Sequence, residues 1–184
     1  MKRRVSLYVG LWLLLLAACQ IDQDKHVNTQ KVRFKTTHSS VLFFKNVRQI
    51  AYDKYENKAT KLDSYRLKER NQAENLPVIN VAIMHNWLAD EAYALVEPNA
   101  FFADMDTIKV NWKNQQNNGE YIFYFGSKEK HYLFLSQLYQ SLQNKDQLWI
   151  QTQQGQVAFL TNQADREALR KTLLDYFRLV GAVQ

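Results

Sequence analysis

Cysteine is almost missing from this chain: Cys19 is the only one among 184 residues. A single thiol forms no disulfide within the chain, so stability must come from an ordinary apolar core. Glycine is also scarce, with five residues that do not cluster, and this excludes the glycine-rich loops that cradle phosphates. No G-x-S-x-G, H-E-x-x-H, Walker or G-x-G-x-x-G pattern is present, so the sequence carries no catalytic signature.

Apolar runs long enough to span a bilayer are missing too. The apolar run at residues 5–16 is about a dozen residues long and is broken by Ser6 and Gly10, whereas a spanning helix needs roughly 20. Basic residues precede the run at positions 2–4, and small residues follow it at positions 17 and 18. A basic start, a short apolar run and small residues before a cut site are typical of a secretory signal.

The end of this leader, Leu16-Ala17-Ala18-Cys19, resembles the lipobox of bacterial lipoproteins, which reads aliphatic, small, small, Cys. The resemblance covers residues 1–19 only. It implies a covalent diacylglycerol on Cys19, cleavage between Ala18 and Cys19, and often acylation of the freed amine. The alternative is an ordinary signal peptide, or an uncleaved anchor, with an incidental cysteine. Because Gln20 and not Asp follows Cys19, the resemblance favours the outer membrane if the source is Gram-negative.

These features predict three parts of the chain. Residues 1–18 are a cleaved signal peptide, residues 19–30 a lipidated flexible tether, and residues 31–184 a single domain. Cleavage would leave 166 residues, which is one domain's length, and would reduce the net charge from +6 to +3. A polar coil of about 12 residues reaches roughly 20 Å, so the domain is expected near the membrane surface.

The charges of the remaining chain are unevenly placed. Residues 25–70 contain twelve Lys and Arg against four acids, and residues 71–108 contain six acids and no Lys or Arg. This asymmetry could mark a binding surface or a bias toward anionic lipid or glycan. Alternatively, neighbouring strands pair these charges across a sheet. Nucleic-acid binding is not expected.

Alternating and apolar runs predict strands in the first half of the domain. A half-buried strand is expected at Val32 and Phe34, and a more buried strand at residues 41–44 that continues toward Tyr52. Residues 53–61 are predicted to be a charged loop or hairpin turn. Three further strands are expected, at residues 62–70, 78–84 and 92–96, with a loop at residues 85–91 between the last two.

The second half repeats one arrangement. Residues 107–144 and 147–180 each predict strand, turn, strand and capped helix, with helices at about 127–144 and 163–180. Ser127 suits the first N-cap, and Asn162 with Asp165 resembles a capping box for the second. The expected fold class is α+β, with a mainly antiparallel β-sheet and the two helices packed on one face.

One local cluster could carry chemistry. His85, Asp90 and Glu91 place an imidazole and two carboxylates in the predicted 85–91 loop, where they could bind a metal or do acid–base work. A polar turn between apolar strands contains such residues anyway, and their spacing matches no metal motif. Trp87 and Leu88 in the same loop could form an exposed recognition tip or fold back over the core. The other histidines, at positions 26, 38 and 131, suggest no site.

The leading hypothesis is a membrane-anchored cell-envelope lipoprotein that acts as a non-enzymatic binding, assembly or accessory module. An inhibitor or immunity-type role is one variant. No cofactor is expected besides the lipid on Cys19, and the expected partners are the membrane, through that lipid, and a protein of the envelope. The alternative is an envelope hydrolase or metal-dependent enzyme that uses His85, Asp90 and Glu91.

Overall fold

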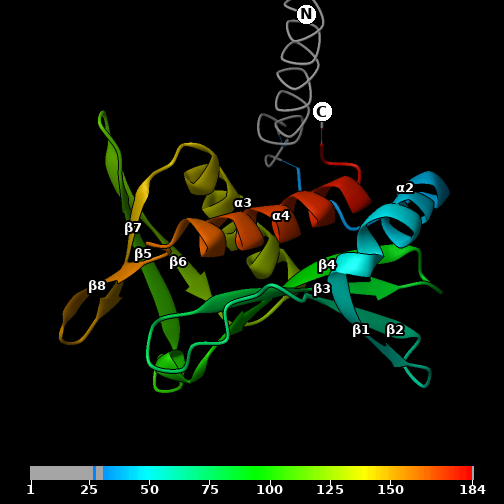
Figure 1. Cartoon of the computed structure of the whole chain (residues 1–184), viewed down its shortest axis with the longest axis horizontal. Coiled ribbons are helices and arrows are strands. Elements are labelled where there is room, and N and C mark those ends of the chain that lie inside the picture. Colours follow the sequence, from blue (N-terminus) through cyan, green and yellow to red (C-terminus); the bar gives the residue numbers. More distant parts are fainter. Residues whose placement is uncertain (1–26, 28–30, 184) are drawn as a thin grey trace, which may run out of the picture.

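Two antiparallel sheets of four strands each make up most of the molecule (Figure 1). A computed structural model describes residue 27 and residues 31–183. The first sheet contains, in order, β1 (Tyr52–Asn57), β2 (Leu62–Leu67), β3 (Ile79–Asn86) and β4 (Glu91–Pro98). The second sheet has the order β6 (Asn118–Tyr124), β5 (Thr107–Lys113), β7 (Gln147–Thr152) and β8 (Gly155–Phe159). The predicted α+β class with antiparallel strands is confirmed.

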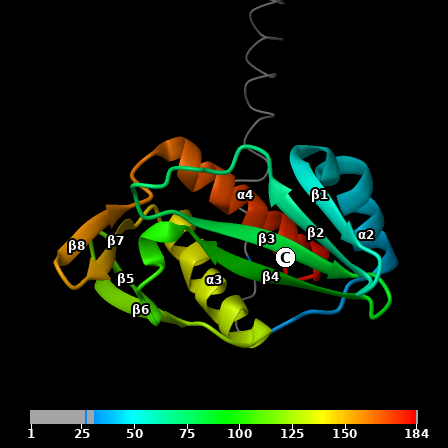
Figure 2. The same cartoon turned by 90° about the horizontal axis from the view of Figure 1, so that it is seen from below.

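Two long helices pack against the sheets. Helix α3 (Lys128–Gln143) contacts β4 and β6, and α4 (Gln163–Leu179) contacts β3 and β4. Both helices therefore lie on one face of the first sheet, and α3 also reaches the second sheet (Figure 2). The predicted repeat is present as β5-β6-α3 followed by β7-β8-α4. The strands, however, divide between two sheets that the shared helices join.

The core lies between the helices and the inner faces of the sheets. Alternate residues of β2 and β3, such as Tyr65, Leu67 and Ile83, are almost fully buried there. Aromatic side chains fill the space between α3 and α4, where the Tyr132 and Tyr139 rings meet the Phe177 ring edge-on. Full burial of one such side chain stabilises the fold by roughly 1.5–3 kcal/mol.

The predicted strand at residues 41–44 is wrong, because this segment is helical. It forms α2 (His38–Phe43), a π-helical turn η2 (Phe44–Arg48) and a 3-10 turn η3 (Gln49–Ala51). Thr37 and Ser40 make a reciprocal capping box that starts the helix. Phe44 is buried against Tyr52 and Tyr65, so the apolar run packs as one side of a helix rather than as a strand.

The predicted loop at residues 53–61 is also wrong over most of its length. Tyr52–Asn57 is the edge strand β1, paired with β2, and only residues 58–61 turn. Charged side chains are compatible with an edge strand because its hydrogen bonds to β2 involve only backbone groups. They also discourage pairing of the free edge with other chains. The strand expected at Val32 and Phe34 is extended but forms only a bridge from Lys35 to Glu91.

Both helix starts lie where they were predicted, but the caps differ from expectation. Ser127 occupies the N-cap of α3 without a side-chain cap bond. Asn162 caps α4 by accepting a hydrogen bond from the Ala164 N–H. The Asp165 carboxylate does not complete the capping box; it accepts a hydrogen bond from Asn71 Nδ2 at 2.9 Å. Asp165 therefore links α4 to the segment before β3.

Candidate functional sites

The predicted loop at residues 85–91 is shorter than expected. His85 and Asn86 end β3, and Glu91 begins β4, so only residues 87–90 form the turn. The Asn86 Oδ1 atom accepts hydrogen bonds from the Leu88 and Ala89 N–H groups, both at 3.1 Å. This side-chain turn replaces strand pairing at the tip of the hairpin.

His85 is a buried residue of the inner face. It lies opposite Asp63 on β2 and Ala92 on β4, with 4% of its surface exposed. Burial lowers the pKa of His85, nearby Lys45 lowers it further, and Asp63 and then Asp90 act in the opposite direction. The buried Nε2 atom makes no hydrogen bond within the protein. His85 is therefore enclosed in the sheet, with its pKa lowered mainly by burial.

Glu91 lies on the opposite face of the sheet from His85, because its neighbour Ala92 is the residue that pairs with His85. Its carboxylate accepts a hydrogen bond from Lys128 Nζ at 3.0 Å, and Lys35 Nζ lies 3.4 Å away. The hydrogen bond from Lys128 is the main reason that the pKa of Glu91 is lowered. Asp90 is exposed in the turn with a left-handed φ of 51°. The three predicted side chains do not converge.

Metal binding finds no support in this region. Within residue 27 and residues 31–183, no three His, Cys, Asp or Glu side chains are grouped so that they could hold a metal ion. Of the other histidines, His131 is buried and its Nδ1 accepts a hydrogen bond from the Val96 N–H at 2.9 Å. His38 is the exposed first residue of α2. The predicted lipid site Cys19, residue Gln20 and His26 lie outside the described residues.

Trp87 and Leu88 are exposed at the hairpin tip, by 46% and 71%. The Lys61 ammonium lies 5.5 Å from the Trp87 ring, from the neighbouring β1–β2 turn. The turn therefore holds both side chains outside the core, and their role in recognition stays a prediction.

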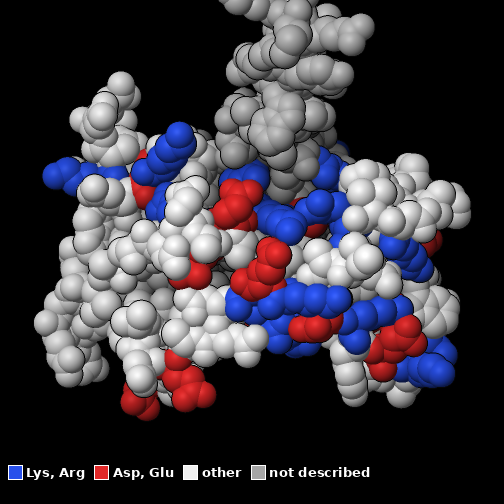
Figure 3. Space-filling view, viewed as in Figure 1, with Lys and Arg blue, Asp and Glu red and all other residues white. Residues whose placement is uncertain are grey.

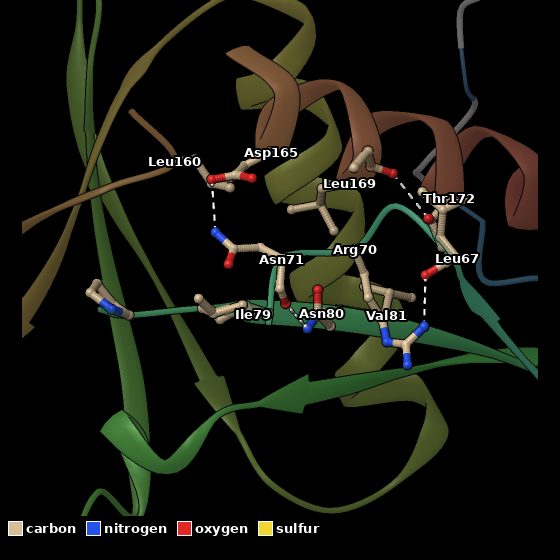
Figure 4. A pocket seen from close by; sticks show the side chains of 13 residues that line it. Leu67, Arg70, Asn71, Ile79, Asn80, Val81, Leu160, Asp165, Leu169 and Thr172 are labelled. Carbon is tan, nitrogen blue, oxygen red and sulfur yellow. Dashed lines mark hydrogen bonds between the residues drawn. The ribbon is translucent and has the colours of Figure 1, made fainter. Parts of the chain in front are cut away.

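A small cavity lies between β3 and α4 (Figure 4). Asn71 crosses its mouth, donating from Nδ2 to Asp165 and accepting at its backbone oxygen from Asn80 Nδ2 at 2.8 Å. The cavity holds about 40 Å³, which is room for a few water molecules. Organic ligands need roughly 300 Å³ or more, so this cavity is not a ligand site.

The open face of the second sheet offers more room for a ligand than this cavity does. Residues of β5 alternate between buried Ile108 and Val110 on the inner face and Lys109 and Asn111 on the open face. In the row through Asn111, register places Glu120 on one side and Trp149 on the other, followed by Ala158. Trp149 is half-buried, and its neighbour in this row, Ala158, has only a methyl side chain.

A groove of about 600 Å³ runs beside Trp149 at this face. Two further hollows, of about 650 and 370 Å³, adjoin it, and all three share Gln147. The residues that line it are Asn111, Trp112, Lys113, Asn118, Gly119, Glu120, Gln147, Trp149 and Gln156, and most of those whose side chains lie on the open face are amides, with Trp149, one lysine and one glutamate; Trp112 is in the inner-face row of Ile108 and Val110. We call this the amide groove. Its opposite charges balance, so it suits an uncharged polar ligand.

Exposed and partly buried polar contacts hold the segments beside the amide groove. Asn114 Oδ1 accepts from the Gln116 and Asn117 N–H groups and shapes the β5–β6 turn. Asn114 Nδ2 donates to buried Asp146 Oδ1 at 2.9 Å, which ties that turn to the start of β7. Arg166 of α4 donates to the Asp146 carbonyl at 3.0 Å. Residues that are already held by hydrogen bonds lose little conformational entropy when a ligand binds, and this favours affinity.

Sequence reasoning missed the amide groove. The signal was present, since six of the eight residues 111–118 and seven of the fourteen residues 143–156 are Asn or Gln. These runs are typical of turns, and their separation in the chain hides that β5 and β7 are neighbours. Pairing of two strands across an intervening helix is a tertiary feature that local patterns do not encode.

Comparisons with known proteins give no match: no family model, no curated protein and no solved structure is similar to this chain. Within the part of the chain that the structure describes, no helix has the length and apolar character needed to cross a membrane. The functional argument therefore depends on the chain's own residues.

Proposed function

We propose that this chain is a non-enzymatic binding module that a lipid on Cys19 anchors in the bacterial cell envelope. The amide groove carries the proposal for binding, because it combines the half-buried Trp149 with several amide side chains beside hydrogen-bonded turns. The lipobox-like Leu16-Ala17-Ala18-Cys19 supports the anchor.

The chemistry of the amide groove favours a hydroxyl-rich, uncharged partner, and an envelope glycan is the class we propose. Each amide of Asn111, Gln147 and Gln156 offers both a donor and an acceptor, which complements hydroxyl groups that also do both. The Trp149 indole offers a rigid apolar surface at low entropic cost. A protein partner, expected from the sequence, is the other occupant that the test must separate.

The alternative of a hydrolase or metal-dependent enzyme gains no support from the described residues. His85 is enclosed in the inner face, and Glu91 is bonded to Lys128 on the other face. Acid–base catalysis needs the groups within reach of one substrate atom.

The groove is tested with mature protein extracted from membranes and purified peptidoglycan sacculi, by co-sedimentation. Trp149→Ala should weaken binding about 30-fold, the effect of losing a central aromatic contact of about 2 kcal/mol. Tyr124→Ala is the matched control, because Tyr124 is an exposed aromatic at the end of β6, in the same sheet as Trp149 but outside the groove. Equal binding by the two variants would contradict the glycan assignment. Recovery of an envelope protein that depends on Trp149 would identify a protein partner instead.

The anchor is tested separately by labelling growing cells with radioactive palmitate. Cys19→Ser should abolish label incorporation and membrane retention, because no other cysteine can form the thioether. Circular dichroism of the variant should stay unchanged. Label uptake by the Cys19→Ser protein would refute the anchor without bearing on the groove.

A further inference from the structure

Exposed apolar side chains gather on the segment from α2 to η3. Leu42, Phe43, Val47 and Ile50 are 38–82% exposed, and we call these four residues the apolar ridge. Phe43 ends α2, Val47 lies in the π-helical turn and Ile50 in the 3-10 turn, at intervals of four and three residues. Phe44 faces the core instead, with 3% exposure. The segment is thus apolar on two sides, and the core explains only one of them.

Among residue 27 and residues 31–183, the other exposed apolar side chains do not form a comparable group on one helix. Tyr124, Phe125 and Leu133 are exposed near the start of α3, but they come from a strand end, a connecting segment and a helix. They provide a matched comparison for the apolar ridge: a second exposed apolar group of similar size elsewhere on the surface.

Positive charge surrounds the apolar ridge. Lys45 is exposed within it, and Lys68 Nζ donates to the Ile50 carbonyl at 2.9 Å. The Arg178 guanidinium lies 5.2 Å from the Phe43 ring. Residues 38–51 contain no acid. In Figure 3 the uncharged surface over α2 has Lys and Arg side chains along its border.

The chain leaves the described domain close to the apolar ridge. Ser40 Oγ of α2 donates to the Leu179 carbonyl at 2.7 Å, at the end of α4. Val183 is four residues further on, at most about 14 Å away by chain length, and it bridges to Val27. Cys19 precedes Val27 by eight residues, a length of chain that spans at most about 28 Å. A lipid on Cys19 would therefore bring the bilayer within reach of the apolar ridge.

We propose that the apolar ridge is a membrane-contact surface that lies on an anionic phospholipid bilayer and fixes the orientation of the tethered domain. The choice of a bilayer as occupant rests on the proposed lipid anchor. Apolar side chains of such a helix enter the boundary between headgroups and acyl chains, and lysines beside them are attracted to anionic lipid. The tether raises the local concentration of the ridge at the bilayer, so a weak contact suffices.

In this orientation the strands that carry the amide groove lie at the other end of the domain from the contact (Figure 1). Strands β5, β7 and β8 lie at the other end of the long axis from α2 (Figure 1). The ridge would hold one end of the domain at the lipid and leave the groove open to a partner.

The test uses the full chain, matured in cells, extracted and reconstituted into vesicles with 30% phosphatidylglycerol in phosphatidylcholine. Val47→Cys is labelled with an environment-sensitive fluorophore, and mass spectrometry verifies the lipid and the single label. Gln154→Cys, exposed in the β7–β8 turn at the far end, is the matched control. The Val47→Cys label should be at least fivefold less accessible to iodide than the Gln154→Cys label, and zwitterionic vesicles should reduce this protection.

A triple variant distinguishes specific contact through the ridge from non-specific adsorption of the protein to vesicles. Adding Leu42→Ser, Phe43→Ser and Ile50→Ser to the labelled chain should remove the protection. The same number of changes at Tyr124, Phe125 and Leu133 should leave it intact.

The outcomes distinguish the ridge from the anchor. A lipidated protein whose two labels are equally accessible overturns the ridge and leaves the anchor standing. An unlipidated protein that floats with anionic vesicles only when the ridge is intact supports the ridge and refutes the anchor. An unlipidated protein that does not float overturns both. A ridge-dependent dimer in detergent, seen by sedimentation, assigns the ridge to a second copy and overturns the bilayer as occupant.

Discussion

Asp175 is the residue whose loss should most disturb the position of the apolar ridge. Its side chain is 1% exposed and accepts hydrogen bonds from Arg48 Nε and Tyr52 Oη, both at 2.7 Å. Arg48 ends η2 and Tyr52 begins β1, so one carboxylate of α4 holds the two residues that flank Ile50, the last residue of the ridge. Burial is the main cause of the raised pKa of Tyr52, and the Asp175 charge adds to it.

The magnitude follows from burial. Replacing Asp175 with alanine leaves the buried Tyr52 hydroxyl without this acceptor and the Arg48 guanidinium without this carboxylate. Breaking a buried, hydrogen-bonded charge pair costs about 3–5 kcal/mol. Asp175→Asn keeps an acceptor in place and removes the charge, so we expect about 1–3 kcal/mol. A domain of this length has a total stability of about 5–15 kcal/mol, so the alanine variant should be folded but weakened.

Urea unfolding followed by circular dichroism measures the free energy of unfolding. With a slope of about 2 kcal/mol per molar urea, Asp175→Ala should lower the midpoint by about 2 M. Asp53→Ala is the control, since its pair with Arg70 is an exposed salt bridge expected to contribute 0–1 kcal/mol. Hydrogen exchange should show the largest loss of protection at residues 44–52. A midpoint shift no larger than that of Asp53→Ala would refute the assigned role of the Asp175 network.

Two further predictions concern pH and packing. Burial lowers the pKa of both His85 and His131, so the unfolded chain binds more protons as the pH falls below about 6.5. The stability they contribute is complete above that pH and is lost below it, toward the lowered folded values. Urea midpoints between pH 7.5 and 5 should fall, and His85→Gln with His131→Gln should flatten the fall; an unchanged slope would contradict this. At Gly119, a Cβ atom would lie 2.9 Å from Trp112 Nε1, so Gly119→Ala should cost about 1–3 kcal/mol and shift the tryptophan emission, unlike Asn118→Ala.

The second half of the domain could be predicted because its local signals agree with its packing. Asn162 caps α4, and the apolar stripe through Leu169 and Leu173 faces the core. Strands β5 to β8 are short, bounded by polar turns, and paired mostly with sequence neighbours. What local signals do not contain is the division into two sheets, because it depends on which strands each helix covers.

The charge asymmetry was only partly informative. Arg66 of β2 forms a forked hydrogen-bonded pair with Glu97 of β4 across Ala82, and Lys35 pairs with Glu91. Basic residues of the first region thus meet acids of the second, as cross-sheet pairing predicts. Lys45 and Lys68 differ, because they lie beside the apolar ridge rather than beside those acids.

The error at residues 41–44 has a physical cause that bears on function. A run of four large apolar residues is read as a buried strand, because a soluble helix normally places polar residues on one side. Here Phe44 meets the core while Leu42 and Phe43 remain exposed, so the helix breaks the pattern expected of a surface helix. Exposed apolar side chains cost solubility and contribute nothing to the core that this segment already covers. Departures from local rules tend to occur at functional sites, and this one lies on the helix that Ser40 joins to Leu179, four residues before the bridge from Val183 to Val27. That coincidence is the reason to assign the ridge to the bilayer before any other surface.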